Sequence, residues 1–193
     1  MVRKFLIGIA GTHSTGKSSF CNVLSESLLA IGVKVSKVPS FGKLAFELGI
    51  PLLKDHTFES TLWFINKTLE AKENAMRNSD VVIVDRPEID SFSYWKAAID
   101  YNKKKWIPEE REKIESLVLE NTKDYTHLFA TKLNPLIPLA PGRDDDLKFR
   151  KSVDFHLHQL TQSLPNKITI LRSDEHQNAF SKLYDEITTS LRT

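Results

Sequence analysis

Short apolar runs alternate along the chain with longer segments in which apolar residues recur every three or four positions. Short runs rich in valine and isoleucine are typical of buried strands, and long periodic segments are typical of amphipathic helices. Strands are predicted over 4–10, 33–38, 81–84, 126–131 and 167–171. Helices are predicted over about 18–31, 40–48, 57–78, 91–101, from 108 onward, 144–164 and 179–191.

This alternation predicts an α/β fold, because a strand that runs parallel to its predecessor needs a crossover, usually a helix, to reach the same end of the sheet. We expect three layers, with a five-stranded parallel sheet between helices, in one domain over 1–193 without repeats or linkers. Ligands of such sheets bind at the carboxyl ends of the strands. The predicted site is therefore formed by the loops that follow Ala10, Val38, Val84, Thr131 and Leu171.

The loop after the first strand carries the clearest chemical signal. Gly11 and Gly16 enclose four residues and precede Lys17-Ser18, which is the P-loop spacing. The glycines let backbone N–H groups point at phosphate oxygens, the lysine adds a cation, and the serine hydroxyl can ligate Mg²⁺. A chance glycine-rich turn is the alternative, but the flanking strand and helix favour a triphosphate site. The predicted ATP-binding residues are Gly11, Thr12, His13, Ser14, Thr15, Gly16, Lys17, Ser18 and Ser19.

Composition narrows the class of protein without pointing to a partner. Of the 193 residues 40% are hydrophobic and 27% charged, which is ordinary for a globular domain with a full core. The net charge of +2 gives no bulk argument for binding nucleic acid or a membrane. The single cysteine, Cys21, excludes an internal disulfide, and packing is its expected role. Without a membrane-length apolar stretch, and with a strand instead of a signal peptide at the start, a cytoplasmic protein is expected.

An acidic and a basic residue follow the third strand. Asp85 stands where a Walker-B acid would, so it could hold Mg²⁺ or accept a proton from an attacking hydroxyl. The alternative is a surface acid that pairs with Arg86. The guanidinium of Arg86 suits a phosphate or a developing phosphoryl charge. Asp90 either serves the site or caps a helix that begins near Ser91, and the sequence leaves both roles open.

A second basic cluster follows a loop rich in proline. Arg143 lies in that loop, and Arg150 lies two turns along the predicted helix. A mobile lid over about 135–164 that carries these arginines could neutralise a transferred phosphoryl group and exclude water. The alternative is a solvated helix whose aspartates 144–146 cap its first turn while Arg150 forms salt bridges. That alternative explains the aspartates well and Arg143 less well.

Together these segments resemble the P-loop nucleoside and nucleotide kinases. The closest resemblance is to a branch of small AAA-labelled ATPase and kinase domains that includes the ribosylnicotinamide kinase domains. It extends over nearly the whole chain and rests on the order of 11–18, Val38-Pro39 with 47–51, Asp85-Arg86 and 142–150. The stretch 85–94 also resembles a motif of deoxynucleoside kinases.

The resemblance implies a role for each candidate residue. The implied catalytic residues are Lys17 toward ATP, Asp85 and Arg86 toward the acceptor, and Arg143 and Arg150 in the lid. Ser18 is implied to bind ATP and Mg²⁺ together with Lys17. The metal would be held by Ser18 and Asp85. The loop 173–178 is implied to lie beside the adenine.

One departure from the family pattern concerns the acceptor. After Val38-Pro39 the family usually has a glutamate and, three positions later, an arginine, whereas this chain has Ser40 and Lys43. In many relatives that glutamate binds or deprotonates the acceptor hydroxyl. Its absence leaves Asp85 as the remaining candidate base.

We therefore expect an ATP- and Mg²⁺-dependent kinase that phosphorylates a hydroxyl or monophosphate of a nucleoside-like acceptor, with no membrane partner. A polynucleotide or modified DNA base is an alternative acceptor, which the basic run 103–105 beside Trp106 permits and the modest net charge disfavours. A regulatory ATPase without a small acceptor is the second alternative. Ser40 in place of the glutamate supports this alternative, whereas the two lid arginines argue against it. Each hypothesis is compatible with a homodimer.

Overall fold

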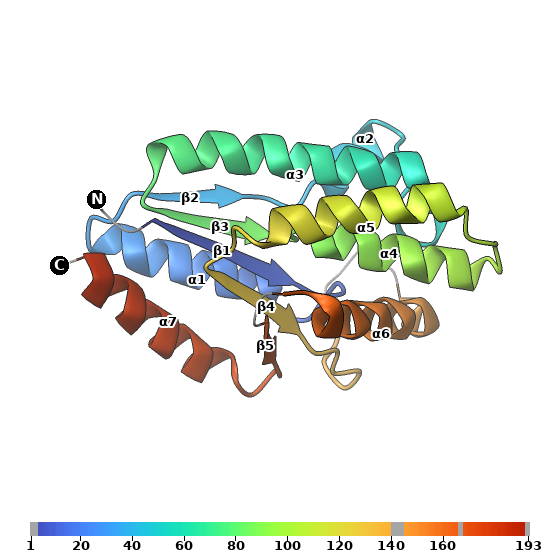
Figure 1. Cartoon of the computed structure of the whole chain (residues 1–193). Coiled ribbons are helices and arrows are strands. Elements are labelled where there is room, and N and C mark those ends of the chain that lie inside the picture. The colour runs from blue at the N-terminus through green and yellow to red at the C-terminus, as the bar shows by residue number, and fades with distance from the viewer. Residues whose placement is uncertain (1–3, 140–144, 166–167, 192–193) are drawn as a thin grey trace.

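A computed structural model describes residues 4–139, 145–165 and 168–191 (Figure 1). The described residues form five strands in one sheet of order β2-β3-β1-β4-β5, and all neighbouring strands are parallel. The strands are β1 Phe5–Ala10, β2 Val35–Val38, β3 Val81–Asp85, β4 His127–Thr131 and β5 Ile168–Leu171. This confirms the predicted five-stranded parallel sheet, with each strand where its apolar run lies.

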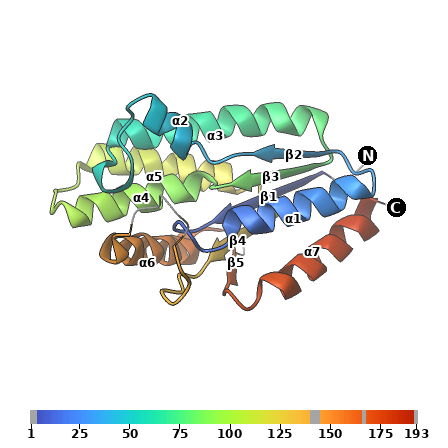
Figure 2. The ribbon, with the colours of Figure 1, turned by 180° about the vertical axis from the view of Figure 1, so that it is seen from behind.

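Helices connect the strands and cover both faces of the sheet (Figures 1 and 2). They are α1 Lys17–Ala30, α2 Gly42–Glu47, α3 Phe58–Asn78, α4 Glu88–Tyr101, α5 Pro108–Thr122, α6 Leu147–Ser163 and α7 His176–Leu191, with a short 3₁₀ turn η1 Leu53–Asp55. No helix in the described part of the chain is long and apolar enough to cross a bilayer.

Each face of the sheet buries its own core, because successive side chains of a strand point to opposite sides. Phe5, Ile7 and Ile9 of β1 belong to the core shared with α1 and α7. Leu6 and Ala10 belong to the core shared with α3, α4, α5 and α6. The sheet is therefore the middle of three layers, as predicted.

Helix α4 begins at Glu88, one turn before the predicted start near Ser91. The Glu88 carboxylate is fully buried, where it accepts hydrogen bonds from Lys72 Nζ at 2.7 Å and from the Tyr125 hydroxyl at 2.9 Å. Pro87 is the N-cap of α4, so Asp90 lies inside its first turn. The capping role that the sequence left open for Asp90 is wrong.

The carboxyl ends of the central strands meet around the loop after β1. Strand β1 lies between β3 and β4, with Ile9 opposite Asp85 on one side and Ala10 opposite Ala130 on the other. The predicted lid segment contains α6, which packs beside α4 (Figure 1). Arg143 lies outside the described residues.

Candidate functional site

The P-loop turns through residues with positive φ. Gly11 has φ of 148°, Ser14 of 56° and Gly16 of 87°. A Cβ atom on Gly11 would lie 1.8 Å from Thr131 Oγ1, and one on Gly16 would lie 2.8 Å from a carbon of the His176 ring. Both glycines are therefore required by their close neighbours as well as by their backbone conformation.

A cavity of about 140 Å³ lies in the curl of this loop, which we call the P-loop cavity. It is lined by residues 13–19 together with Ser40 and Arg86. The buried hydroxyl oxygens of Thr12 and Ser14 have no hydrogen-bond partner among the described residues. Since buried polar atoms are normally paired and Ser14 lines the cavity, this loop suits an anionic ligand that would accept from the Ser14 hydroxyl.

Gly11 and Thr12 form the base of the loop and are not part of the cavity wall. The Gly11 N–H donates to Asp90 Oδ1 at 2.7 Å, so this donor is already used. The Thr12 carbonyl accepts from Lys17 Nζ. These two predicted ATP-binding residues therefore shape the loop.

Lys17 is buried and points back at its own loop. Its Nζ donates to the Thr12 carbonyl and to Thr15 Oγ1 at 3.3 Å. Burial, and then the nearby charge of Arg86, lower the pKa of Lys17 from 10.5 to about 7. A phosphate beside this amine would favour its charged form.

Ser18 and Asp85 provide two oxygen atoms that fit Mg²⁺. Ser18 Oγ donates to Asp85 Oδ2 at 2.6 Å, while Asp85 Oδ1 is buried with no partner within the described ranges. Among those residues, no group of three or more His, Cys, Asp or Glu could hold a metal. This suits Mg²⁺, which proteins usually bind through one or two side chains plus substrate phosphates and water.

Arg86, Asp90 and Tyr94 form a braced cluster behind the P-loop. Arg86 Nη1 donates to the Gly11 carbonyl at 3.1 Å, to Asp90 Oδ2 at 2.9 Å and to the Tyr94 hydroxyl at 3.3 Å. Burial opposes the charge of Arg86, but Tyr94 and Asp90 outweigh it and raise its pKa above the usual value. The guanidinium is therefore a fixed cation at the site.

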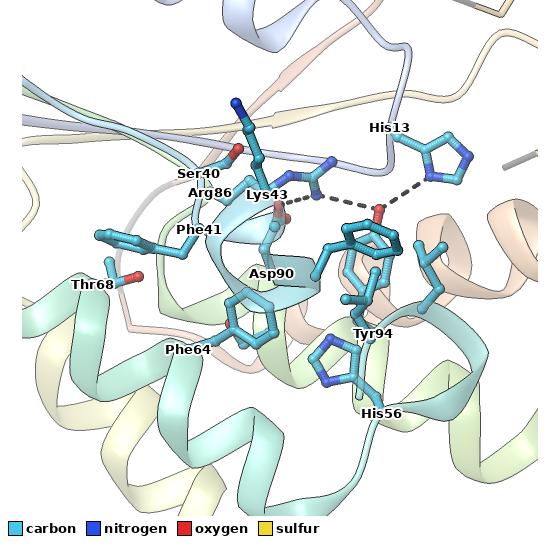
Figure 3. A pocket seen from close by; sticks show the side chains of 15 residues that line it. His13, Ser40, Phe41, Lys43, His56, Phe64, Thr68, Arg86, Asp90 and Tyr94 are labelled. Atoms are coloured by element: carbon cyan, nitrogen blue, oxygen red, sulfur yellow. Dashed lines mark hydrogen bonds and ion pairs between the residues drawn. The ribbon is translucent and has the colours of Figure 1, made fainter. Parts of the chain in front are cut away.

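A second cavity, of about 380 Å³, adjoins the P-loop cavity, and we call it the aromatic cavity (Figure 3). His56 lies between the rings of Phe64 and Tyr94, with centroid distances of 5.2 and 6.0 Å. The lining residues are His13, Ser40, Phe41, Gly42, Lys43, Phe46, Leu52, Leu53, His56, Phe64, Thr68, Arg86, Asp90, Ser91 and Tyr94. Its volume is in the range of ligand-binding pockets.

Three aromatic side chains, Phe41, Phe64 and Tyr94, line the aromatic cavity. Trp63 does not line it and instead packs edge-on against Phe64 at 5.0 Å. His56 was missed, because a single histidine in a loop carries no local signal. Burial, and then the charge of Arg86, lower the pKa of His56 to about 3, so this ring is neutral.

The two cavities share part of their walls. His13, Ser40 and Arg86 line both of them. Ser40, at the position where the family usually has a glutamate, therefore lies at the junction of the two cavities. This arrangement can hold a phosphorylated ligand in one cavity and a second small molecule beside it.

Arg150 reaches the P-loop from α6. It is only 3% exposed, and its Nη2 donates to the His13 carbonyl at 3.2 Å. The solvated-helix alternative is therefore wrong for this residue, although Asp146 does cap α6 by accepting from the Phe149 N–H at 2.9 Å. A shared lid role for Arg150 and Arg143 stays a prediction.

The remaining sequence candidates lie at the edges of the site. His176, the first residue of α7, lies against Gly16 and edge-on to Phe20 at 6.0 Å. Lysines 103–105 are exposed on the turn between α4 and α5. Trp106 is partly buried against the core and forms a T-shaped pair with Trp95 at 5.0 Å.

Comparisons with known proteins bear on the family and the fold. A family model described as "AAA domain" matches residues 6–178. Deoxyadenosine kinase from M. mycoides with bound dATP is 15% identical, with 93% of this chain and 98% of that chain covered and a TM-score of 0.64. The same enzyme with bound dCTP is 16% identical, covers 96% and 100%, and has a TM-score of 0.64.

A further similar structure is the NadR protein in complex with NR, which is 14% identical with a TM-score of 0.64. The match covers 94% of this chain but 49% of that chain, so this protein spans about half of its length. No curated protein matches the chain. At these identities the structural similarity concerns the fold. Because the family model covers most of its residues, the chain belongs to the AAA domain family, and it has the fold of the P-loop nucleoside kinases.

Proposed function

We propose that this protein is an ATP- and Mg²⁺-dependent kinase that transfers the γ-phosphoryl group of ATP to a small nucleoside-like acceptor. The observation that carries this proposal is the contact between the P-loop cavity and the aromatic cavity through His13, Ser40 and Arg86. Enzymes of this kind act mainly by positioning two reactants and neutralising charge. The fold likeness to deoxyadenosine kinase, and to NadR in complex with NR, supports the same assignment.

The donor half of the reaction uses the P-loop. Lys17 neutralises the outer phosphates, and Ser18 and Asp85 would hold Mg²⁺ together with phosphate oxygens. When bound, the metal supplies charge neutralisation at the phosphates. The 2.6 Å bond between Ser18 and Asp85 favours the metal-side role of Asp85 over a role as base.

The acceptor half uses the aromatic cavity. Flat rings from Phe41, Phe64 and Tyr94 suit a nucleobase, which needs apolar surface with a few polar contacts. Arg86 stabilises the charge that develops on the transferred phosphoryl group. Arg150 holds the P-loop at His13 in this arrangement.

Transfer of label from γ-labelled ATP tests the proposal. The purified protein with Mg²⁺ and a panel of nucleosides and their 5′-monophosphates should give a labelled product and an equal amount of ADP. Lys17→Ala should abolish both products, and Lys182→Ala on the exposed side of α7 should change neither. Lys17-dependent ATP hydrolysis with no small acceptor labelled would support a regulatory ATPase instead. Label found only in added oligonucleotides would support the polynucleotide alternative.

A further inference from the structure

We infer that the acceptor is a nucleoside monophosphate whose phosphate lies at the junction of the two cavities, and not an unphosphorylated nucleoside. This inference rests on the proposed kinase function and names its substrate class. It follows from the set of charged groups that the fold places at Ser40 and Arg86.

The two acceptor classes need different groups from the protein. A hydroxyl loses a proton as it attacks phosphorus, so a base must lie within hydrogen-bond reach. A phosphate monoester carries a charge of about −1.5 to −2 at neutral pH and presents an oxygen that is already ionised. It needs cations and hydrogen-bond donors in place of a base.

Among the described residues, neither cavity is lined by a free carboxylate. Asp90 is the one carboxylate among the described residues that line the aromatic cavity. It is buried, and both oxygens are engaged, Oδ1 by the Gly11 N–H at 2.7 Å and Oδ2 by Arg86 at 2.9 Å. Asp85 is not among the described residues that line either cavity, and it holds Ser18.

The same end of the aromatic cavity is rich in donors. Within the described residues, the three hydrogen bonds of Arg86 all use Nη1, which leaves Nε and Nη2 for a ligand, and its side chain is 23% exposed. Lys43 has a 90% exposed side chain, and its ion pair with Glu47 at 3.8 Å is a weak surface pair. Ser40 adds a hydroxyl at the junction.

Part of the ring wall lies away from the polar groups, whereas Tyr94 lies on the Arg86 side of the cavity, with its hydroxyl 3.3 Å from Arg86 Nη1, and Phe41 directly follows Ser40. Figure 3 shows Ser40, Lys43 and Arg86 together at one end and His56 and Phe64 at the other. A nucleoside monophosphate has an anionic phosphate at one end and an aromatic base at the other, which fits a phosphate at the junction and a base toward His56 and Phe64. Arg86 and Lys43 exceed the single negative charge of Asp90, so the cavity favours an anionic ligand.

The transfer balances without a protein base. An ionised oxygen of the monophosphate attacks the γ-phosphorus of ATP and forms a new P–O bond. The bond from the γ-phosphorus to the bridging oxygen breaks, and ADP leaves with the electron pair. The products are a nucleoside diphosphate and ADP.

Binding without ATP tests the inference independently of turnover. Calorimetric titration should show that the best-bound 5′-monophosphate binds at least tenfold more tightly than its own nucleoside. Lys43→Gln should weaken monophosphate binding by about tenfold and leave nucleoside binding unchanged, since it removes one exposed charge–phosphate contact. Lys34→Gln, an exposed change away from both cavities, should alter neither. A nucleoside that binds as tightly as its monophosphate would overturn the inference.

Turnover separates this inference from the kinase proposal. With ATP and Mg²⁺, kcat/KM should be at least tenfold higher for a monophosphate than for its nucleoside. The Ser40→Glu variant should lower kcat/KM for the monophosphate at least tenfold, because it places a negative charge at the junction. Equal or faster transfer to nucleosides, or transfer confined to 5′-phosphorylated oligonucleotides, overturns the inference. If no acceptor in the panel is phosphorylated, the kinase proposal is overturned. The relative affinity for the monophosphate and its nucleoside then still shows whether the cavity selects a phosphate.

Discussion

The Ser18 hydroxyl donates a 2.6 Å hydrogen bond to Asp85 Oδ2, although the two residues are 67 positions apart. The parallel pairing of β1 with β3 sets Ile9 opposite Asp85, and α1 starts one short loop after β1. The sheet thereby brings a hydroxyl and a carboxylate to the edge of the P-loop cavity. The first prediction concerns this pair.

Asp85→Asn should raise the Mg²⁺ concentration needed for half-maximal activity about tenfold or more. A neutral amide is a poorer ligand than a carboxylate for a hard cation, while the amide oxygen can still accept from Ser18. Initial rates over a Mg²⁺ titration measure the effect. Asp185→Asn on the exposed side of α7 is the matched control and should leave the titration unchanged. An Asp85→Asn curve that coincides with the wild type would refute a metal-side role.

ATP binding should take up a proton at pH 8. Burial holds the pKa of Lys17 at about 7 in the free protein, so at pH 8 its amine is mostly neutral. Bound phosphates raise that pKa, so binding is coupled to protonation, and affinity should fall by up to about tenfold per pH unit above pH 7. Below pH 7 the amine is already charged, and this dependence should vanish.

Calorimetry in two buffers with different ionisation enthalpies measures this proton uptake. At pH 8 we expect nearly one proton per ATP for the wild type and much less for Lys17→Met. Equal uptake by the two proteins would show that another group titrates.

Arg150→Ala should lower kcat about tenfold or more, because its guanidinium holds the P-loop at the His13 carbonyl from a buried position on α6. Lys151→Ala, the neighbouring exposed cation, should stay within twofold of the wild type. Steady-state kinetics with saturating Mg²⁺ compares them. Similar losses in both variants would mean that general charge on α6 matters and the specific contact does not.

Gly11→Ala should destabilise the fold by more than about 2 kcal/mol and remove ATP binding. The new Cβ would lie 1.8 Å from Thr131 Oγ1, on a backbone with φ of 148°. Gly42→Ala meets nothing within 4 Å, so its stability should change little. Urea unfolding compares the two variants. A Gly11→Ala protein as stable as Gly42→Ala would contradict the described loop.

Lys72→Met should cost about 3–5 kcal/mol of stability, because it leaves the buried Glu88 carboxylate without its cation. The Tyr125 hydroxyl would remain as its partner and would not replace the charge. The double variant Lys72→Met with Glu88→Leu should recover most of the loss, since no uncompensated charge stays buried. Denaturant unfolding of the two single variants and the double variant gives the coupling energy. If the double variant is no more stable than Lys72→Met, the loss of stability comes from lost packing and not from the unpaired carboxylate.

The start of α4 shows where prediction from the sequence fails. Asp90-Ser91 has the composition of a helix cap, and a glutamate such as Glu88 is rarely buried. Glu88 is nevertheless buried, because Lys72 of α3 and Tyr125 before β4 satisfy its carboxylate. Both partners are distant in sequence, so no local sequence pattern predicts these contacts. Asp90 therefore does not cap the helix. Its carboxylate instead accepts hydrogen bonds from the Gly11 N–H and from Arg86.

The sequence by itself determined the five strands, the helices between them and the P-loop, because each depends on periodicity or on a fixed spacing within a few residues. Only the tertiary structure decided what lines the aromatic cavity. His56, Thr68 and Ser91 come from separate elements, and their joint cavity arises from the packing of α2, α3 and α4. The engagement of Asp90 is decided in the same way, since a hydrogen bond to Gly11 spans 79 positions. Local patterns set the P-loop side of the site, and long-range packing sets the aromatic cavity beside it.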